Sequence, residues 1–191
     1  FCSFDLESAG ELAGIVQMSA QLWRPNPVDV TGQDVIVEEE TFNSYVCPPD
    51  GAIWNEQACR QSHGLGPASE VIKNARDFAF VWTQFQDWFS RNTSPHEKCI
   101  FVAWNGATCD LRWIWRHLQA PRSELNMPPG MKYFLDPLKV IRHYKSCALH
   151  PVKSKLESLE LGSVYKFITG TNLNGAHDSL VDVKAQTEIV T

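Results

Sequence analysis

The sequence predicts an α/β domain in which a mixed, five-stranded β-sheet is flanked by α-helices. Residues 1–40 contain three short segments that are apolar or alternate between apolar and polar residues, which is typical of strands linked by hairpins and loops. Beyond residue 69, segments with helical spacing of apolar residues alternate with short apolar segments, which is typical of strands connected by crossover helices. The chain of 191 residues is expected to form a single domain over 1–191.

The N-terminal part of the chain is expected to contain three strands, at 1–6, 14–23 and 34–40. The turn-rich segment 24–32 separates the second strand from the third, and this arrangement indicates a β-meander with one long loop. Prolines and glycines are frequent in 47–67, so we expect a loop there that contains at most a short helix.

The rest of the chain is expected to alternate between helices and strands. Apolar residues recur every three or four positions from Ile72 to Phe89, which predicts one helix over 69–91. The continuous apolar segment 99–104 has the length of a buried central strand. The remaining expected elements are a helix at 111–118, a strand at 133–136, a helix that begins at Pro137, and two closing helices at 156–170 and 178–190.

The bulk composition narrows the class of protein. No run of about 18 apolar residues occurs, so no membrane span is expected. Six cysteines without a C-x-x-C pair favour a reducing, intracellular compartment, either the cytoplasm or the nucleus. The chain begins without a methionine or a leader segment, so we expect it to be part of a longer protein, within which it forms one domain.

The distribution of charge bears on the choice of partner. The formal net charge of −5 argues against a uniformly basic surface that coats nucleic acid. However, 139–155 carries five lysines and arginines and no acidic residue. This segment is a candidate to follow the phosphates of a bound strand, and a solvated helix and loop without a partner is the alternative.

Two acidic residues lie on the first expected strand. Asp5 and Glu7 are two positions apart, so their carboxylates project from the same face of the strand, near its C-terminal end. Ligand sites in α/β proteins gather at such strand ends. Two like charges held this close are unfavourable unless a cation or a shared proton relieves them. Taken alone, the pair is also consistent with an exposed strand end.

A third acidic residue, Asp110, follows the buried strand 99–104 at the start of the next expected helix. If that strand pairs with the first one, Asp110 approaches Asp5 at the same edge of the sheet. The alternative is a purely local role, because an aspartate at this position stabilises a helix N-terminus through capping and the macrodipole. Stability alone does not explain why a third carboxylate should come to the same place.

The fourth acidic residue, Asp182, follows His177 by five positions. Five residues correspond to about 140° around a helix, so the two side chains cannot share a helical face. Gly175 favours a loop, and Asp178 or Ser179 can cap a helix that begins after the histidine. The histidine then lies on a loop and the aspartate in the helix, which suits a proton carrier and a metal ligand. A surface histidine beside a solvated aspartate is the alternative.

Together the three acidic segments resemble the motifs of the DEDDh family of DnaQ-like 3′→5′ exonucleases. FDLESAG at 4–10 is similar to the first motif of that family, WNGATCDLRWI at 104–114 to the second, and AHDSLVD at 176–182 to the third. The connecting segments SHGLGP, FLDPLKVIR and LGSVYKFITG also resemble those of the family. The resemblance covers nearly the whole chain and implies an RNase H-like fold.

The resemblance implies a hydrolase that releases nucleoside 5′-monophosphates from the 3′ ends of single-stranded DNA or RNA. It gives metal-ligand roles to four carboxylates and the role of general base to a histidine: Asp5, Glu7, Asp110, Asp182 and His177. Two Mg²⁺ or Mn²⁺ ions are the expected cofactors, because all-oxygen ligation favours them over Zn²⁺. The residues expected to contact substrate are Leu6, Ser8, Trp104, Asn105, Lys139 and Arg142.

The sequence departs from the family pattern at several positions. Ser8 and Ala9 stand where two threonines are common, and Trp104 replaces a frequent histidine. Ser179 replaces the usual alanine. None of these changes removes a catalytic group, so they bear on substrate preference. Two other functions stay open: a catalytically silent domain that binds nucleic acid or protein, and an accessory proofreading or RNA-silencing domain of a longer protein.

A second cluster of metal-ligand residues has a less specific pattern. His143, Cys147 and His150 would share one face if a helix extended over all three. A structural zinc ion needs a fourth ligand, and none is present at a suitable spacing. Ordinary packed or solvated positions are the favoured interpretation.

Overall fold

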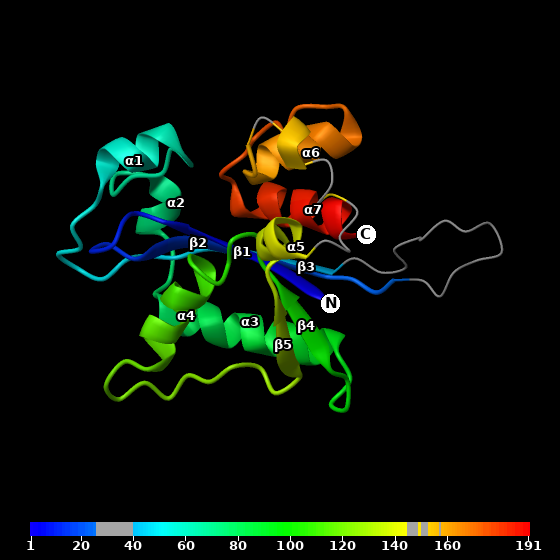
Figure 1. Ribbon diagram of the computed structural model, residues 1–191. Coiled ribbons are helices and arrows are strands. Elements are labelled where there is room, and N and C mark those ends of the chain that lie inside the picture. The colour runs from blue at the N-terminus through cyan, green and yellow to red at the C-terminus, as the bar shows by residue number, and fades with distance from the viewer. Residues whose placement is uncertain (26–39, 145–148, 150–152, 157) are drawn as a thin grey trace.

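Helices cover both faces of a five-stranded sheet of order β3-β2-β1-β4-β5 (Figure 1), which confirms the expected mixed α/β architecture. This computed structural model describes residues 1–25, 40–144, 149, 153–156 and 158–191. The strands are β1 Cys2–Ser8, β2 Ile15–Leu22, β3 Glu40–Tyr45, β4 Cys99–Val102 and β5 Met131–Leu135. The α-helices are α1 Glu56–Gln61, α2 Glu70–Lys73, α3 Phe78–Asn92, α4 Asp110–Leu118, α5 Pro137–His143, α6 Leu161–Thr169 and α7 Ser179–Val190, with a 3₁₀ turn at Lys153–Lys155. Within the described ranges, no helix has the length and apolar character that a membrane span requires.

The strand pairing brings the two halves of the chain together at β1. This strand pairs antiparallel with β2 and parallel with β4. The C-terminal ends of β1 and β4 therefore lie at the same edge of the sheet, as expected if Asp110 is to approach Asp5. β4 ends at Val102 opposite Ser3, so the last residues of β1 extend beyond it. Of the strand expected at 34–40, only the final residue falls within the described part of the chain, and it begins β3.

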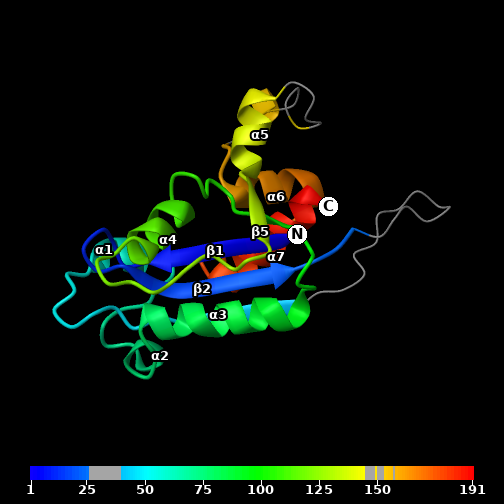
Figure 2. The ribbon, with the colours of Figure 1, turned by 90° about the horizontal axis from the view of Figure 1, so that it is seen from below.

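Alternation along β1 separates an apolar face from a polar face. The apolar face, with Cys2, Phe4 and Leu6, packs in an aromatic core between the sheet and α3. In this core the ring of Phe4 lies 4.6 Å from that of Phe101 and 5.7 Å from that of Phe85. Figures 1 and 2 show α3 on one side of the sheet and α7 on the other. The face toward α7 carries Ser3, Asp5 and Glu7.

The helix expected over 69–91 is interrupted, and this expectation is wrong in detail. Asp77 caps a new helix, α3, by accepting a hydrogen bond from the N–H of Phe80 at 2.8 Å. One residue earlier, Arg76 forms a parallel β-bridge with Val46. Backbone groups engaged in that bridge are not available to a continuous helix. The apolar spacing runs across the break, so the sequence pattern does not reveal it.

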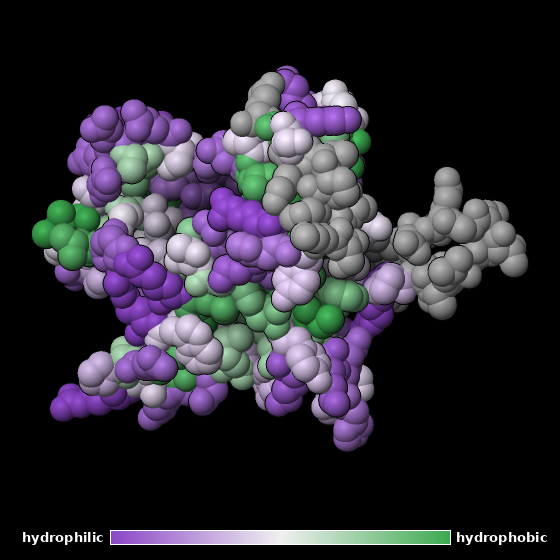
Figure 3. Space-filling view, viewed as in Figure 1, coloured by the Kyte–Doolittle hydropathy of each residue, from purple (hydrophilic) through white to green (hydrophobic). Residues whose placement is uncertain are grey.

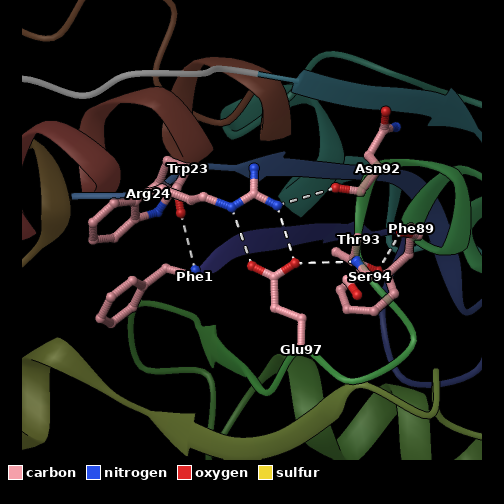
Figure 4. Close-up of polar contacts among 8 residues, drawn as sticks. All are labelled: Phe1, Trp23, Arg24, Phe89, Asn92, Thr93, Ser94 and Glu97. Carbon is pink, nitrogen blue, oxygen red and sulfur yellow. Dashed lines mark hydrogen bonds and ion pairs between the residues drawn. The ribbon is translucent and has the colours of Figure 1, made fainter. Parts of the chain in front are cut away.

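A cluster of hydrogen bonds and an ion pair connects the residues that follow β2 to the turn between α3 and β4 (Figure 4). Arg24 donates from Nε and Nη2 to the two carboxylate oxygens of Glu97 at 3.1 and 3.0 Å. The same carboxylate accepts the N–H of Ser94 at 3.1 Å. The amino group of Phe1 donates to the carbonyl of Trp23 at 2.9 Å, which places this cluster at the N-terminal end of β1. Exposed ion pairs contribute at most about 1 kcal/mol, so the cluster serves mainly to position the chain.

Candidate active site

A cavity of about 530 Å³ lies where β1 ends and α7 begins. Its walls come from β1, the loop before α4, α5, the segment before α6 and the N-terminus of α7. Figure 3 shows hydrophilic surface in the hollow between the lobe of α1 and α2 and the lobe of α6. The cavity brings together nine of the residues expected to form the site: Asp5, Leu6, Glu7, Trp104, Asn105, Asp110, Arg142, His177 and Asp182.

The geometry of β1 places the first three carboxylates. Asp5 and Glu7 share the face toward α7, and both line the cavity. Because β4 ends before this part of β1, the N–H of Leu6 has no partner from that strand. It donates instead to Asp110 Oδ1 at 2.9 Å. This hydrogen bond fixes the first residue of α4 beside the end of β1.

The loop that carries Asp110 is held by a buried aspartate at the start of α5. Asp136 is 5% exposed and accepts the N–H of Asn105 at 3.1 Å and the N–H of Ala107 at 3.4 Å. Asn105 has a left-handed backbone, with φ of 56°. At Gly106 a Cβ would lie within 2.4 Å of the Cβ of Ala103, so only glycine fits this turn.

Gln186 ties the same loop to the sheet from the other side. Its side-chain carbonyl accepts the N–H of Trp104 at 2.9 Å, and its amide group donates to the carbonyl of Phe4 at 2.8 Å. Gln186 is 1% exposed, so both hydrogen bonds are shielded from water. One side chain of α7 therefore joins the middle of β1 to the segment that follows β4.

His177 lies in a tight turn directly before α7. Its φ is 68°, and that of Gly175 is 82°. The N–H of His177 donates to Asp182 Oδ2 at 3.1 Å. Asp178 caps the helix by accepting the N–H of Leu180 at 3.0 Å. The expected arrangement is confirmed, with the histidine before the helix and Asp182 in its first turn.

The donor set fits a divalent cation. Ligand atoms of Glu7, His177 and Asp182 lie within 4.8 Å of one another. Asp5 Oδ2 and Asp182 Oδ1 are buried and have no hydrogen-bond partner among the described residues. Buried polar atoms without partners are rare in native proteins, and carboxylate oxygens are the ligands that hard cations prefer. The residues of the cavity therefore fit a divalent cation.

Burial is the largest cause of the raised pKa of each of the four site carboxylates, and repulsion from nearby aspartates or glutamates adds to it. Burial, aided by the charges of Asp182 and Asp110, raises the pKa of Glu7 from 4.5 to about 8. Burial raises the pKa of Asp110 from 3.8 to about 7, although hydrogen bonds from backbone N–H groups oppose the shift. Burial is also the largest cause of the raised pKa values of Asp5 and Asp182. Without a cation, the cluster therefore retains protons at neutral pH.

Sequence comparison finds no matching family model and no matching curated protein. Comparison of structures finds a full-length 3′-exonuclease with a TM-score of 0.72 and 18% identity, matched over 99% of this chain and 58% of that one. The nuclease domain of 3′hExo, a DEDDh family member bound to rAMP, has a TM-score of 0.69 and 18% identity over 99% of this chain and 88% of that one. The chain has the fold of the DnaQ-like exonucleases.

A further structure with the DnaQ-like fold concerns 3′-end-specific recognition of a histone mRNA stem-loop by a 3′-exonuclease. Its TM-score is 0.71 at 16% identity, over 99% of this chain and 78% of that one. The chain thus spans between 58% and 88% of the length of these three proteins. The RNase H-like sheet implied by the sequence motifs is confirmed as the fold.

The residues expected to contact substrate fall into two groups in this DnaQ-like fold. Leu6, Trp104, Asn105 and Arg142 line the cavity. Ser8 and Lys139 are not among its lining residues: the carbonyl of Ser8 lies 3.2 Å from Nε2 of His63, and Lys139 lines a separate cavity beside β5. Arg142 and Lys139 lie on the same helix, α5, but they face different cavities.

The sequence motifs did not identify several neighbours of the site. His63 holds the backbone that follows Glu7, and burial lowers its pKa, with the nearby His177 adding to the shift. The exposed thiol of Cys109 and the segment 158–161 also line the cavity. His63, Cys109 and Leu161 lie within segments that resemble those of the family, whereas residues 158–160 carried no signal. Of the candidate zinc ligands, Cys147 and His150 lie outside the described residues.

Proposed function

We propose that the protein is a metal-dependent 3′→5′ exonuclease that acts on single-stranded DNA or RNA ends. One observation carries the proposal. Four carboxylates from three distant segments meet in one cavity beside a histidine, and two of them have buried oxygens without a hydrogen-bond partner in the described part of the chain. The fold supports it, because three structures with this fold are described as 3′-exonucleases or as the nuclease domain of a DEDDh protein.

The four carboxylates would hold two divalent ions. When bound, such ions neutralise the charge that builds up at the scissile phosphate and on the departing 3′ oxygen. Asp182 and Glu7 would contribute the oxygens that already lie together, and Asp5 would contribute its orphaned Oδ2. Asp110 would contribute a carboxylate that Leu6 holds in place. Mg²⁺ and Mn²⁺ suit this all-oxygen set better than Zn²⁺ does.

His177 would act as the general base. Its imidazole is exposed next to the cluster, on a turn whose backbone is fixed by Asp182. A neutral imidazole accepts the proton of the attacking water as the oxygen of that water bonds to phosphorus. The bond between phosphorus and the 3′ oxygen of the preceding nucleotide then breaks, and a nucleoside 5′-monophosphate is released.

The cavity wall would select the terminal nucleotide. Leu6 and Trp104 offer apolar surface for its base, and Asn105 and Arg142 offer groups for its sugar or phosphate. Trp104 is 9% exposed and its Nε1 donates to the carbonyl of Leu159 at 3.3 Å, so its ring is held in one orientation. RNA deserves testing alongside DNA, because two structures with this fold concern rAMP and a histone mRNA stem-loop.

The test is hydrolysis of 5′-labelled single-stranded DNA and RNA in Mg²⁺, in Mn²⁺ and in EDTA. We expect stepwise shortening with either metal ion and none in EDTA. Asp5→Ala should abolish the shortening, whereas Asp87→Ala, which removes an exposed carboxylate on α3, should not. Binding of these oligonucleotides without any metal-dependent shortening would overturn the proposal and favour a catalytically silent domain.

A further inference from the structure

The two β2 residues that lie opposite the carboxylates of β1 also hold the N-terminus of α7. Gln17 pairs with Glu7, and Ser19 pairs with Asp5, in the antiparallel ladder. Residues directly opposite each other in such a ladder point to the same face of the sheet. Gln17 and Ser19 therefore face α7, and both are buried, at 1% and 0% exposure.

The Gln17 side chain forms hydrogen bonds with two consecutive residues at the start of α7, Asp178 and Ser179. Its side-chain carbonyl accepts the N–H of Ser179 at 3.4 Å, and its amide group donates to Asp178 Oδ1 at 3.3 Å. The amide group also donates to Asn43 Oδ1 of β3 at 3.3 Å. Next to it, the Ser19 hydroxyl lies 2.6 Å from that of Ser179. The serine at position 179, where the resembling family usually has alanine, supplies the second hydroxyl of this contact.

The imidazole of His177 takes its position from the backbone of the turn. Among the described residues the imidazole forms no hydrogen bond, and the side chain is exposed. The turn is anchored on one side by the hydrogen bond from the N–H of His177 to Asp182, and on the other side by Asp178, which Gln17 holds. A left-handed backbone at a residue other than glycine persists only where its surroundings hold it.

We propose that Gln17 is a positioning residue, which sets the place of the His177 turn relative to the carboxylates of β1. This inference rests on the proposed function of the cavity. Gln17 pairs with Glu7 in the ladder of β1 and β2, and its side chain donates a hydrogen bond to Asp178, the residue that follows His177. A displacement of about 1 Å at a reacting group can reduce turnover about a hundredfold. Loss of the hydrogen bonds between Gln17 and the start of α7 should therefore lower kcat. The residues of the cavity wall that would bind substrate are not affected, so KM should not change.

The first experiment compares Gln17→Met with Gln21→Met. Gln21 is a matched control, because it lies on the same face of β2, is also 1% exposed, and pairs with Ser3 at the distant end of β1. Gln17→Met removes three hydrogen bonds and should lower the melting temperature. Gln21→Met should not lower it, because the side-chain oxygen of Gln21 is buried without a hydrogen-bond partner among the described residues. Only Gln17→Met should lower kcat, by about 10- to 100-fold, with KM unchanged within about twofold.

The second experiment exchanges the two partners. Gln17→Glu alone sets one carboxylate against another at Asp178 and should lower kcat. Combining it with Asp178→Asn restores a donor and an acceptor in reversed places, keeps the total charge of the pair, and retains a good helix cap. The double variant should regain at least about tenfold in kcat over Gln17→Glu.

The inference is overturned if Gln17→Met keeps the wild-type kcat, or if its kcat falls no more than that of Gln21→Met. If wild-type protein hydrolyses no oligonucleotide, the proposed function fails and a second readout decides the inference. The ring signals of His177 in NMR spectra should then shift or broaden in Gln17→Met and not in Gln21→Met. Equal spectra in the two variants would contradict the positioning role.

Discussion

At the scale of single residues, the charge on Asp5 opposes folding when no cation is bound. Its carboxylate is raised in pKa by burial and by the charges of Asp110 and Glu7, and one of its oxygens has no partner among the described residues. We therefore expect Asp5→Asn to raise the free energy of unfolding of the metal-free protein by on the order of 1 kcal/mol at pH 8. Chemical denaturation in EDTA measures this, and a destabilised variant would contradict the assignment.

For His177, in contrast to Asp5, we expect a substitution to affect turnover and not stability. Because the imidazole forms no hydrogen bond with the described residues, His177→Ala should change the melting temperature little. It should lower kcat by about 10²- to 10⁴-fold, the usual contribution of a general base. His96→Ala, which removes another exposed histidine, is the control. Near-wild-type turnover of His177→Ala at neutral pH would exclude the role of base.

At the scale of elements, two helix caps with the same chemistry differ in what else they hold. Asp77 caps α3 and Asp136 caps α5. Either change to alanine should cost about 1 kcal/mol through the lost cap. Asp136→Ala should also lower kcat, because Asp136 holds the loop between β4 and Asp110. Denaturation curves and turnover measured on both variants test this, and equal turnover would show that the loop does not depend on Asp136.

The elements could be predicted from the sequence where the pattern is local. The spacing around His177 gave the start of α7, and the apolar segment after residue 98 gave β4. The break between α2 and α3 could not be predicted, because it depends on the bridge from Arg76 to Val46. The hydrogen bonds from Gln17 to the start of α7 join residues about 160 positions apart in the sequence, and a buried glutamine in a strand gives no indication of its distant partner.

The candidate site was predictable for a different reason. The first acidic segment ends β1 and the second begins α4, and parallel pairing of β1 with β4 brings these two segments together. The third segment begins α7, and its grouping with the other two was predicted from the resemblance to the DEDDh motifs. The residues that hold these segments, such as Asp136 and Gln186, were not predicted. Their role is defined by backbone groups that belong to other elements, and backbone groups have no sequence signature.

At the scale of the whole molecule, stability should depend on pH in a way that a divalent cation suppresses. Glu7 and Asp110 have pKa values raised from 4.5 and 3.8 to about 8 and about 7, so the folded state binds protons more tightly than the unfolded state does. Between about pH 5 and pH 8 the unfolded state therefore binds fewer protons, and the metal-free fold loses stability as the pH rises.

Excess Mg²⁺ or Mn²⁺ should flatten this dependence, because ionised carboxylates in the folded state then have a partner. Melting temperatures in EDTA and in metal, measured between pH 5 and pH 8.5, provide the comparison. The increase in melting temperature on adding metal should grow with pH. Parallel curves in the two conditions would show that the cluster does not bind the cation.

The most direct test of the central claim is the direction of metal-dependent degradation. One single-stranded oligonucleotide, made as DNA and as RNA, is labelled either at its 5′ end or at its 3′ end and incubated with the protein and Mg²⁺ or Mn²⁺. A 3′→5′ exonuclease gives a descending ladder from the 5′ label and immediate release of a labelled mononucleotide from the 3′ label. Internal fragments from both labels, or no product that depends on the metal, would contradict the claim.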